Sequence, residues 1–174
     1  MRPKLLIYLF AILLLFGCDK IKQETLIEYS SDAGRFSVKM PGNPKKDKNS
    51  LQTAVGTIVM YSFSVEKADI AYVVAYIDYP GSVIEKVDPD QLLDNARNGA
   101  LQKAGGNLLS EKNIDYNGYS ARELEFEVKG GLGLGRAVHL LADNRLYQVM
   151  VIGLKLTFPT ETVQEFINSF EMWD

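Results

Sequence analysis

The segment from residue 121 to residue 155 constrains the fold most, because it has the pattern of three consecutive strands. Leu124 and Phe126 alternate with glutamates, which predicts a strand with one buried and one solvent-facing side. After a glycine-rich turn, residues 136–142 and 146–153 are apolar on nearly both faces. Strands of that kind belong to sheets that other layers cover on both sides. We therefore expect an antiparallel sheet with a covering layer on each face.

Two helices are predicted, and they could supply those layers. Asp88 and Pro89 form a helix start, small apolar residues recur at helical spacing up to Ala104, and Gly105 ends the segment. After Pro159, apolar residues again recur at i, i+3, i+4 and i+7. The order of strands, helix, strands and helix predicts an α+β domain in which helices flank an antiparallel β-sheet, an α/β/α sandwich.

Further strands are predicted before the first helix. Residues 57–65 and 70–79 form one pair, and the second of these is apolar on both faces, which places it near the sheet centre. A hairpin is predicted over about residues 25–40. The charged run 45–48 (KKDK) is predicted to be a solvated loop, because it falls short of the roughly 4 to 8 clustered basic residues of a lipid-binding segment.

The N-terminal segment has the pattern of a signal peptide. Arg2 and Lys4 precede an uncharged, apolar run over 5–16, which is shorter than the roughly 20 residues of a spanning helix. Residues 15–18 (LFGC) resemble the lipobox of bacterial lipoproteins, in which the cysteine, here Cys18, is lipidated and becomes the new N-terminus. Phe16 is bulkier than the residue that the lipobox usually has at this position. An ordinary cleaved secretory signal and an uncleaved anchor stay open as alternatives.

These features divide the chain into a lipoprotein signal peptide (1–17), the lipidated cysteine with a tether (18–24) and one domain (25–174). The lipid would hold the domain on the extracytoplasmic side of the cell membrane. Asp19 resembles the signal that retains lipoproteins in the inner membrane of bacteria that sort by this position, which implies the periplasmic face there. Cys18 is the only cysteine, so the domain has no disulfide and depends on packing for stability.

Several function classes are disfavoured by composition. The formal net charge is -3, which argues against a nucleic-acid surface. One histidine, His139, and one cysteine make a Cys/His zinc site or a Cys–His nucleophile improbable. The glycines of 130–135 lack the spacing and the following helix of a phosphate loop, and the alternating glutamates of 123–127 are the solvent face of a strand. We predict no catalytic residue, no metal and no cofactor.

Tyrosines are the candidate binding residues, because tyrosine is favoured where one end of a side chain is apolar and the other wet. The alternative is that they cap the sheet edges and satisfy their hydroxyls locally. The candidates are Tyr72, Tyr76, Tyr116, Tyr119 and Tyr147.

A family resemblance covers about residues 36–170. The stretches that carry it are 36–44 (FSVKMPGNP), 93–97 (LDNAR), 117–119 (NGY), 122–126 (RELEF), 144–148 (NRLYQ) and 166–170 (FINSF). They resemble a family of uncharacterised bacterial secreted or lipid-anchored domains, similar in architecture to the PsbP and Mog-type Ran-binding fold, an α/β/α sandwich. These motifs are turn and core signatures, so they imply a fold and carry over no catalytic residue.

The resemblance implies a binding role, because photosystem extrinsic proteins and the Ran-binding protein of the wider fold act as accessory modules. We expect a lipid-anchored, extracytoplasmic, non-enzymatic binding module for a membrane or envelope protein. The alternatives are a small-ligand carrier with a pocket between sheet and helix, and an enzyme with an unrecognised site. A module predicts an exposed apolar or tyrosine patch, a carrier an enclosed pocket, and an enzyme converging polar groups with shifted pKa values.

Overall fold

The computed structural model describes residues 24–53 and 56–173. Of these residues 55% lie in strands and 24% in helices. The strands are β1 (Ile27–Ser31), β2 (Phe36–Met40), β3 (Lys45–Thr53), β4 (Gly56–Glu66), β5 (Ile70–Asp78), β6 (Gly106–Tyr116), β7 (Tyr119–Val128), β8 (Gly133–Ala142), β9 (Arg145–Leu154) and β10 (Glu171–Met172). The helices are α2 (Gly81–Ile84), α3 (Pro89–Ala104) and α4 (Thr160–Asn168), with single 3-10 turns η1 (Lys129–Gly131) and η2 (Lys155–Thr157).

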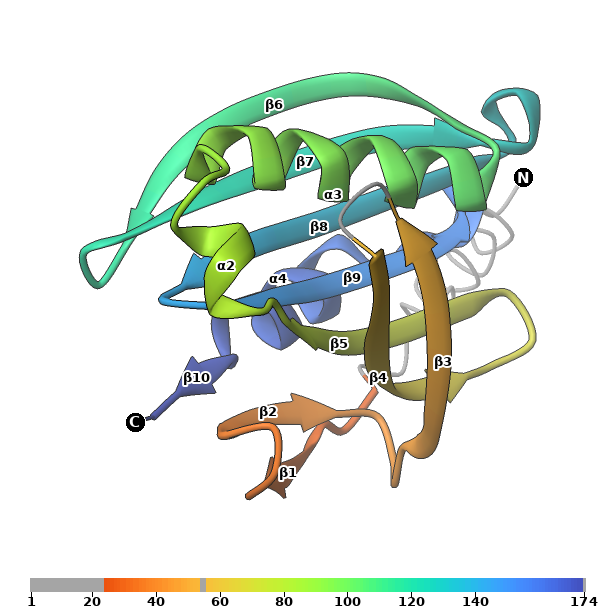
Figure 1. Ribbon diagram of the computed structural model, residues 1–174. Coiled ribbons are helices and arrows are strands. Elements are labelled where there is room, and N and C mark those ends of the chain that lie inside the picture. Colours follow the sequence, from red (N-terminus) through yellow and green to blue (C-terminus); the bar gives the residue numbers. More distant parts are fainter. Residues whose placement is uncertain (1–23, 54–55, 174) are drawn as a thin grey trace, which may run out of the picture.

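A seven-stranded antiparallel sheet in the order β3-β4-β5-β9-β8-β7-β6 forms the centre of the domain (Figure 1). The predicted three-strand segment is confirmed as β7, β8 and β9, and Leu124 lies opposite Ala137, which lies opposite Met150. The predicted pair before the first helix is confirmed as β4 and β5. β5 lies between β4 and the middle strand β9, near the sheet centre, as its apolar faces require.

One face of the sheet is covered by α3, which lies along β7 and β8 in Figure 1. The predicted start and stop of this helix are confirmed. The Asp88 carboxylate accepts a hydrogen bond from the Asp90 N–H at 2.8 Å, and Gly105 ends the helix in the left-handed conformation. Leu92 and Leu93 are buried against the sheet in one core cluster.

The opposite face is covered by α4 and by a second, three-stranded sheet in the order β1-β2-β10. Phe36 of β2 is fully buried, and its ring packs against those of Phe63 and Phe170, with 5.2 Å and 5.7 Å between the ring centroids. The small sheet is also tied to the large one by polar bonds, because the Tyr147 hydroxyl donates to the Gly34 carbonyl at 2.9 Å.

The predicted fold class, a sheet flanked by helices as an α/β/α sandwich, is wrong. The domain is β-rich, with ten strands and three helices among the described residues. One cause is that the predicted hairpin over 25–40 is not part of the large sheet. It forms a separate sheet with β10, and this sheet covers much of the face that a second helical layer would cover.

The predicted loop at 45–48 is also wrong, because these residues begin β3, at the edge of the large sheet. Their side chains are exposed, so burial gave no signal for a strand. Lys48 lies over the ring of Tyr61 at 5.3 Å, which gives its apolar stem a surface to cover. Lysines on an edge strand also discourage pairing with another chain.

The strand turns lie at two opposite ends of the large sheet, as antiparallel pairing requires. The turns at 117–118 and 143–144 share one end. The turn at 67–69, η1 and η2 share the other, because Gly133 at the start of β8 pairs with Leu154 at the end of β9.

Candidate functional site

An open apolar groove of about 220 Å³ lies on the face of the large sheet that α4 covers only in part. Its lining residues are Ile114, Tyr116, Val138, Val149, Ile167, Asn168 and Phe170. Ile114 and Tyr116 point to the same side because they are two residues apart on β6. Since α4 ends at Asn168, the sheet beyond that point is left open between α4 and β6.

The floor of the groove is rigidly packed. Phe170 is 3% exposed, and its ring lies 5.3 Å from the ring of Tyr147. The end of α4 is fixed by Ser169, whose hydroxyl accepts from the Lys39 N–H at 2.8 Å and donates to the Phe166 carbonyl at 2.7 Å. A side chain that entered the groove would therefore meet a preformed surface.

Tyr116 supplies the polar part of the groove. Its hydroxyl donates to the Phe170 carbonyl at 2.6 Å, and burial, followed by the charge of Glu171, raises the pKa of the phenol. Tyr116 is thus neutral at physiological pH and cannot act there as a base. The groove can bind apolar side chains and can offer the Asn168 amide for hydrogen bonds.

The five candidate tyrosines are not gathered on one exposed face. Tyr72, Tyr76 and Tyr147 are 0%, 4% and 2% exposed and belong to the core cluster on the α4 side. Tyr116 lines the groove, and Tyr119 is half-buried and packs against the same cluster. A role for these five residues in binding stays a prediction.

The buried tyrosines differ in how their hydroxyls are satisfied. The Tyr147 hydroxyl is bonded, whereas that of Tyr72 has no hydrogen-bond partner among the described residues. Burial raises the pKa of Tyr72 to about 12. The Arg145 guanidinium lies over the ring of Tyr76, 4.5 Å from the ring centroid. The same guanidinium forms an ion pair with the Asp78 carboxylate, with 2.5 Å between Nε and Oδ1.

The other lining residues were not predicted from the sequence. An Asn117-Gly118 dipeptide indicates a hairpin turn, so the residues just before it could be assigned to the end of β6. No local pattern indicates that Ile167 of α4 lies near Ile114, because that proximity depends on the order of the strands in the sheet.

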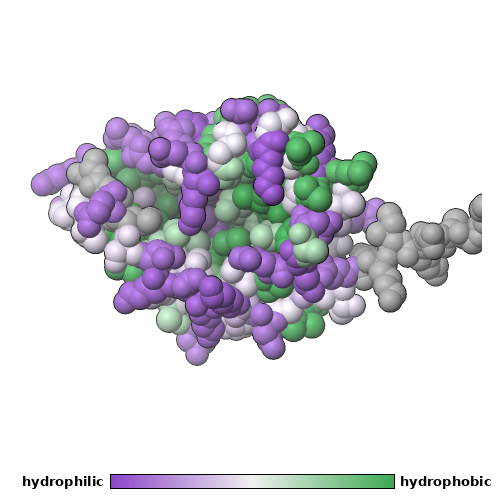
Figure 2. Space-filling model, turned by 90° about the vertical axis from the view of Figure 1, so that its right-hand side faces the viewer, coloured by the Kyte–Doolittle hydropathy of each residue, from purple (hydrophilic) through white to green (hydrophobic). Residues whose placement is uncertain are grey.

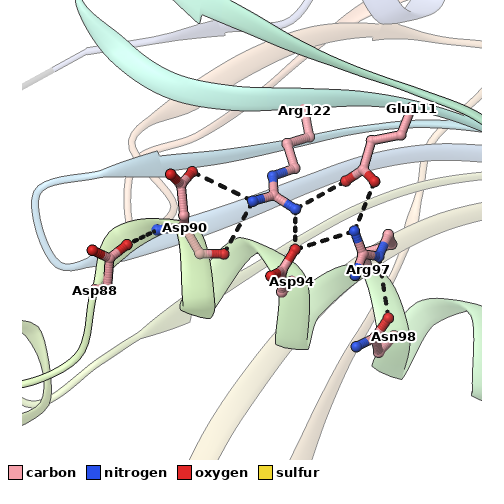
Figure 3. Close-up of polar contacts among 7 residues, drawn as sticks. All are labelled: Asp88, Asp90, Asp94, Arg97, Asn98, Glu111 and Arg122. Carbon is pink, nitrogen blue, oxygen red and sulfur yellow. Dashed lines mark hydrogen bonds and ion pairs between the residues drawn. The ribbon is translucent and has the colours of Figure 1, made fainter.

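A polar cluster joins α3 to β6 and β7 on the other face (Figure 3). The buried Arg122 guanidinium donates to Glu111 at 2.9 Å, to the Asp90 carbonyl at 3.2 Å and to Asp94. Arg97 donates to the other oxygen of Glu111 at 2.7 Å. The hydrogen bond from Arg122 lowers the pKa of Asp94. Glu111 and Asp94 are each bonded to Arg122, whose buried Nε alone has no hydrogen-bond partner among the described residues. The paired charges assign the cluster a structural role in holding α3 to the sheet.

His139 lies on β8 directly opposite Arg122 and is 0% exposed. Neither ring nitrogen has a hydrogen-bond partner among the described residues. Burial, followed by the charges of Arg122 and Arg97, lowers the pKa of His139 to about 4. The histidine is therefore neutral at physiological pH and closed off from solvent.

Two further expectations can be compared with the structure only in part. Within residues 24–53 and 56–173, no group of three or more His, Cys, Asp or Glu residues could hold a metal ion. In the same part of the chain, no helix is long and apolar enough to cross a membrane. Cys18, the signal peptide over 1–17 and all but the last residue of the 18–24 tether lie outside the described residues.

Comparison with solved structures identifies the fold. The solution structure of cyanobacterial PsbP (CyanoP) from Synechocystis sp. PCC 6803 matches with a TM-score of 0.59 at 13% identity, over 91% of this chain and 99% of that chain. The chain has a PsbP-like fold. The expected likeness to that fold is thus confirmed, while membership of a lipoprotein or secreted family stays a prediction.

Other comparisons add less to the PsbP-like assignment. A crystal structure of a protein of unknown function from Pseudomonas aeruginosa matches with a TM-score of 0.42 at 12% identity, over 78% of this chain and 88% of that chain, which is too low to carry an argument about fold. No family model matches the sequence, and no curated protein matches it.

Proposed function

We propose that this protein is a non-enzymatic accessory module, lipid-anchored through Cys18 on the extracytoplasmic side of a membrane, that binds an envelope protein partner. The observation that carries the proposal is the open apolar groove between α4 and β6. We assign the groove to an apolar side chain on a segment of that partner. The PsbP-like fold is compatible with a binding role but does not specify one.

The chemistry of the groove and of the Arg122 cluster favours binding over catalysis. Apart from Tyr116, the groove is lined by apolar residues and one amide. The acidic and basic groups of the Arg122 cluster are engaged with one another rather than aimed at an open cavity. A catalytic site needs a nucleophile or a general base within reach of a bound substrate, and the groove offers neither.

The size and shape of the groove favour a protein segment over a small-molecule cargo. Pockets that enclose small ligands have volumes of roughly 300–1,000 Å³, and this groove is smaller and open to solvent. An anchor side chain of a partner needs only a pocket of its own size, with neighbouring contacts that exclude water.

A photo-crosslinking experiment in native membranes tests this proposal. A photoreactive residue is placed at Asn168, at the end of α4, in the full chain, and the same chain with Ile114→Ser is compared. The matched control is Ile152→Ser, the same chemical change on a half-buried residue of the opposite face. Burying an isoleucine contributes about 1.5–3 kcal/mol, so Ile114→Ser should weaken capture of the partner at least about tenfold.

The expected result is one crosslinked envelope protein that is lost with Ile114→Ser and retained with Ile152→Ser. Circular dichroism of the three chains shows whether each is folded. Equal capture by all three folded chains, or no crosslink above background, overturns the assignment of the groove.

A further inference from the structure

Three leucines with exposed side chains lie at the end of the sheet that carries η1 and η2. Leu132 is 70% exposed, Leu154 41% and Leu156 96%. The two loops that hold them are joined, because the Lys155 N–H donates to the Leu132 carbonyl at 2.9 Å. We call this surface the leucine end. Figure 2 looks onto this side of the molecule and shows apolar surface there between hydrophilic side chains.

The described chain begins at the same end. Glu24 forms an ion pair with Lys67 at 2.9 Å, in the turn between β4 and β5. That turn is bonded to the leucine loops, since the Leu154 N–H donates to the Asp69 carbonyl at 2.9 Å and the Thr157 hydroxyl donates to the Asp69 carboxylate at 2.6 Å. A continuous set of contacts therefore connects Glu24 with the exposed leucines.

The length of chain before Glu24 limits how far this end can lie from a lipid attached at Cys18. Five residues lie between the two positions, so the chain takes six steps from Cys18 to Glu24. Even a fully extended chain spans at most about 3.5 Å per residue, so the Glu24 backbone lies within about 20 Å of Cys18. A lipid at Cys18 would thus keep this end of the domain close to the bilayer surface.

The side chains at this end suit a lipid surface. Single exposed leucines are common, but three on two bonded loops form an apolar contact that water solvates poorly. Lys129 and Lys155 are exposed and form no ion pair with the described residues, so their ammonium groups can meet lipid phosphates. The domain as a whole is acidic, so the leucines rather than charge would supply most of the attraction.

We propose that the leucine end rests on the bilayer, with the side chains of Leu132, Leu154 and Leu156 in the boundary between headgroups and acyl chains. This inference rests on the proposed lipid anchor. It adds that the domain has one fixed orientation on the membrane and does not swing freely on its tether.

A fluorescence experiment on the lipidated full chain tests this orientation. The chain is purified from membranes and reconstituted into vesicles of phosphatidylethanolamine and phosphatidylglycerol with nitroxide-labelled lipid. Lipidation of Cys18 consumes the only native thiol, so an engineered cysteine is the single site for an environment-sensitive dye. The dye is placed at Lys155→Cys, with Ser120→Cys beside the 117–118 turn at the opposite end as the matched control.

The expected result is blue-shifted emission and strong quenching by the nitroxide lipid at position 155, and neither at position 120. Adding Leu132→Ser and Leu156→Ser to the Lys155→Cys chain should remove most of the quenching. Each leucine that leaves the lipid should lower the equilibrium constant between the docked and undocked states about tenfold.

The outcomes separate the inference from the proposal on which it rests. Mass spectrometry that finds no lipid on Cys18 overturns the anchor and this inference with it. A lipidated chain whose dye stays in water at position 155, or is quenched equally at both positions, overturns the orientation alone. A blue shift that depends on protein density and not on nitroxide lipid also overturns it, because a second copy of the chain would then cover the leucines.

Discussion

Replacement of His139 by leucine should make the stability of the domain less dependent on pH. In the folded state, burial lowers the pKa of His139 to about 4, against an ordinary value of 6.5. His139 therefore becomes protonated below about pH 6.5 in the unfolded chain but only below about pH 4 in the folded chain. As the pH falls from 6.5 to 4, the wild-type domain therefore becomes less stable, whereas the His139→Leu chain loses no stability from this position.

The size of the effect follows from the same two values. One pKa unit corresponds to about 1.4 kcal/mol, so about 2 kcal/mol is lost between pH 6.5 and pH 5. Carboxyl groups ordinarily titrate below that range, and the pKa of Asp94 is lowered further by its hydrogen bond from Arg122. Leucine also removes two buried ring nitrogens that have no partner among the described residues, so the variant should be at least as stable at pH 7.

Urea denaturation followed by circular dichroism at pH 7, 6 and 5 measures the free energy of unfolding of both chains. The gap between them should widen by about 2 kcal/mol from pH 7 to pH 5. A gap that stays constant over this range would refute the reasoning, because it would mean that the histidine takes up its proton in the folded state as readily as in the unfolded one.

Two pairs of substitutions test the packing in the same assay. Gly135→Ala places a Cβ atom 2.2 Å from the ring of Phe126 and should destabilise the domain by roughly 1–3 kcal/mol, whereas Gly99→Ala, in open space on α3, should stabilise it by about 0.5–1 kcal/mol. Tyr147→Phe removes a bonded hydroxyl and should cost about 1–3 kcal/mol, whereas Tyr72→Phe removes a hydroxyl without a described partner and should cost nothing. Equal effects within either pair would contradict the described contacts.

The sequence predicted local structure well because its signals are local. The alternation of Leu124 and Phe126 with glutamates, the Asp88 cap and the Gly105 stop each depend on a few neighbouring residues, and each is confirmed. The layers were predicted wrongly because they depend on distant pairing. Nothing near Phe36 indicates that β2 pairs with β10 rather than joining the large sheet.

Of the groove residues, the sequence singled out only Tyr116, and a binding role for Tyr116 stays a prediction. An apolar surface with tyrosine was expected, and the groove has Tyr116 in its wall. The sequence could not distinguish Tyr116 from Tyr72 or Tyr147. A tyrosine can line a groove, and it can equally well lie in the core where its hydroxyl reaches a carbonyl, as that of Tyr147 does. Strand order and the point where α4 ends decide between the two.

The groove and the leucine end are linked by the strands that run between them. Val149 in the groove floor and Leu154 at the leucine end belong to the same strand, β9, and are five residues apart, or about 17 Å along it. Tyr116, before the turn at the opposite end, lies farther from the leucines. With the leucine end on a bilayer, the groove would stand above the lipid headgroups at a fixed height. A partner would then have to present its apolar side chain from a segment outside the membrane, and crosslinks from Asn168 should fall in such a segment rather than in a membrane-spanning helix.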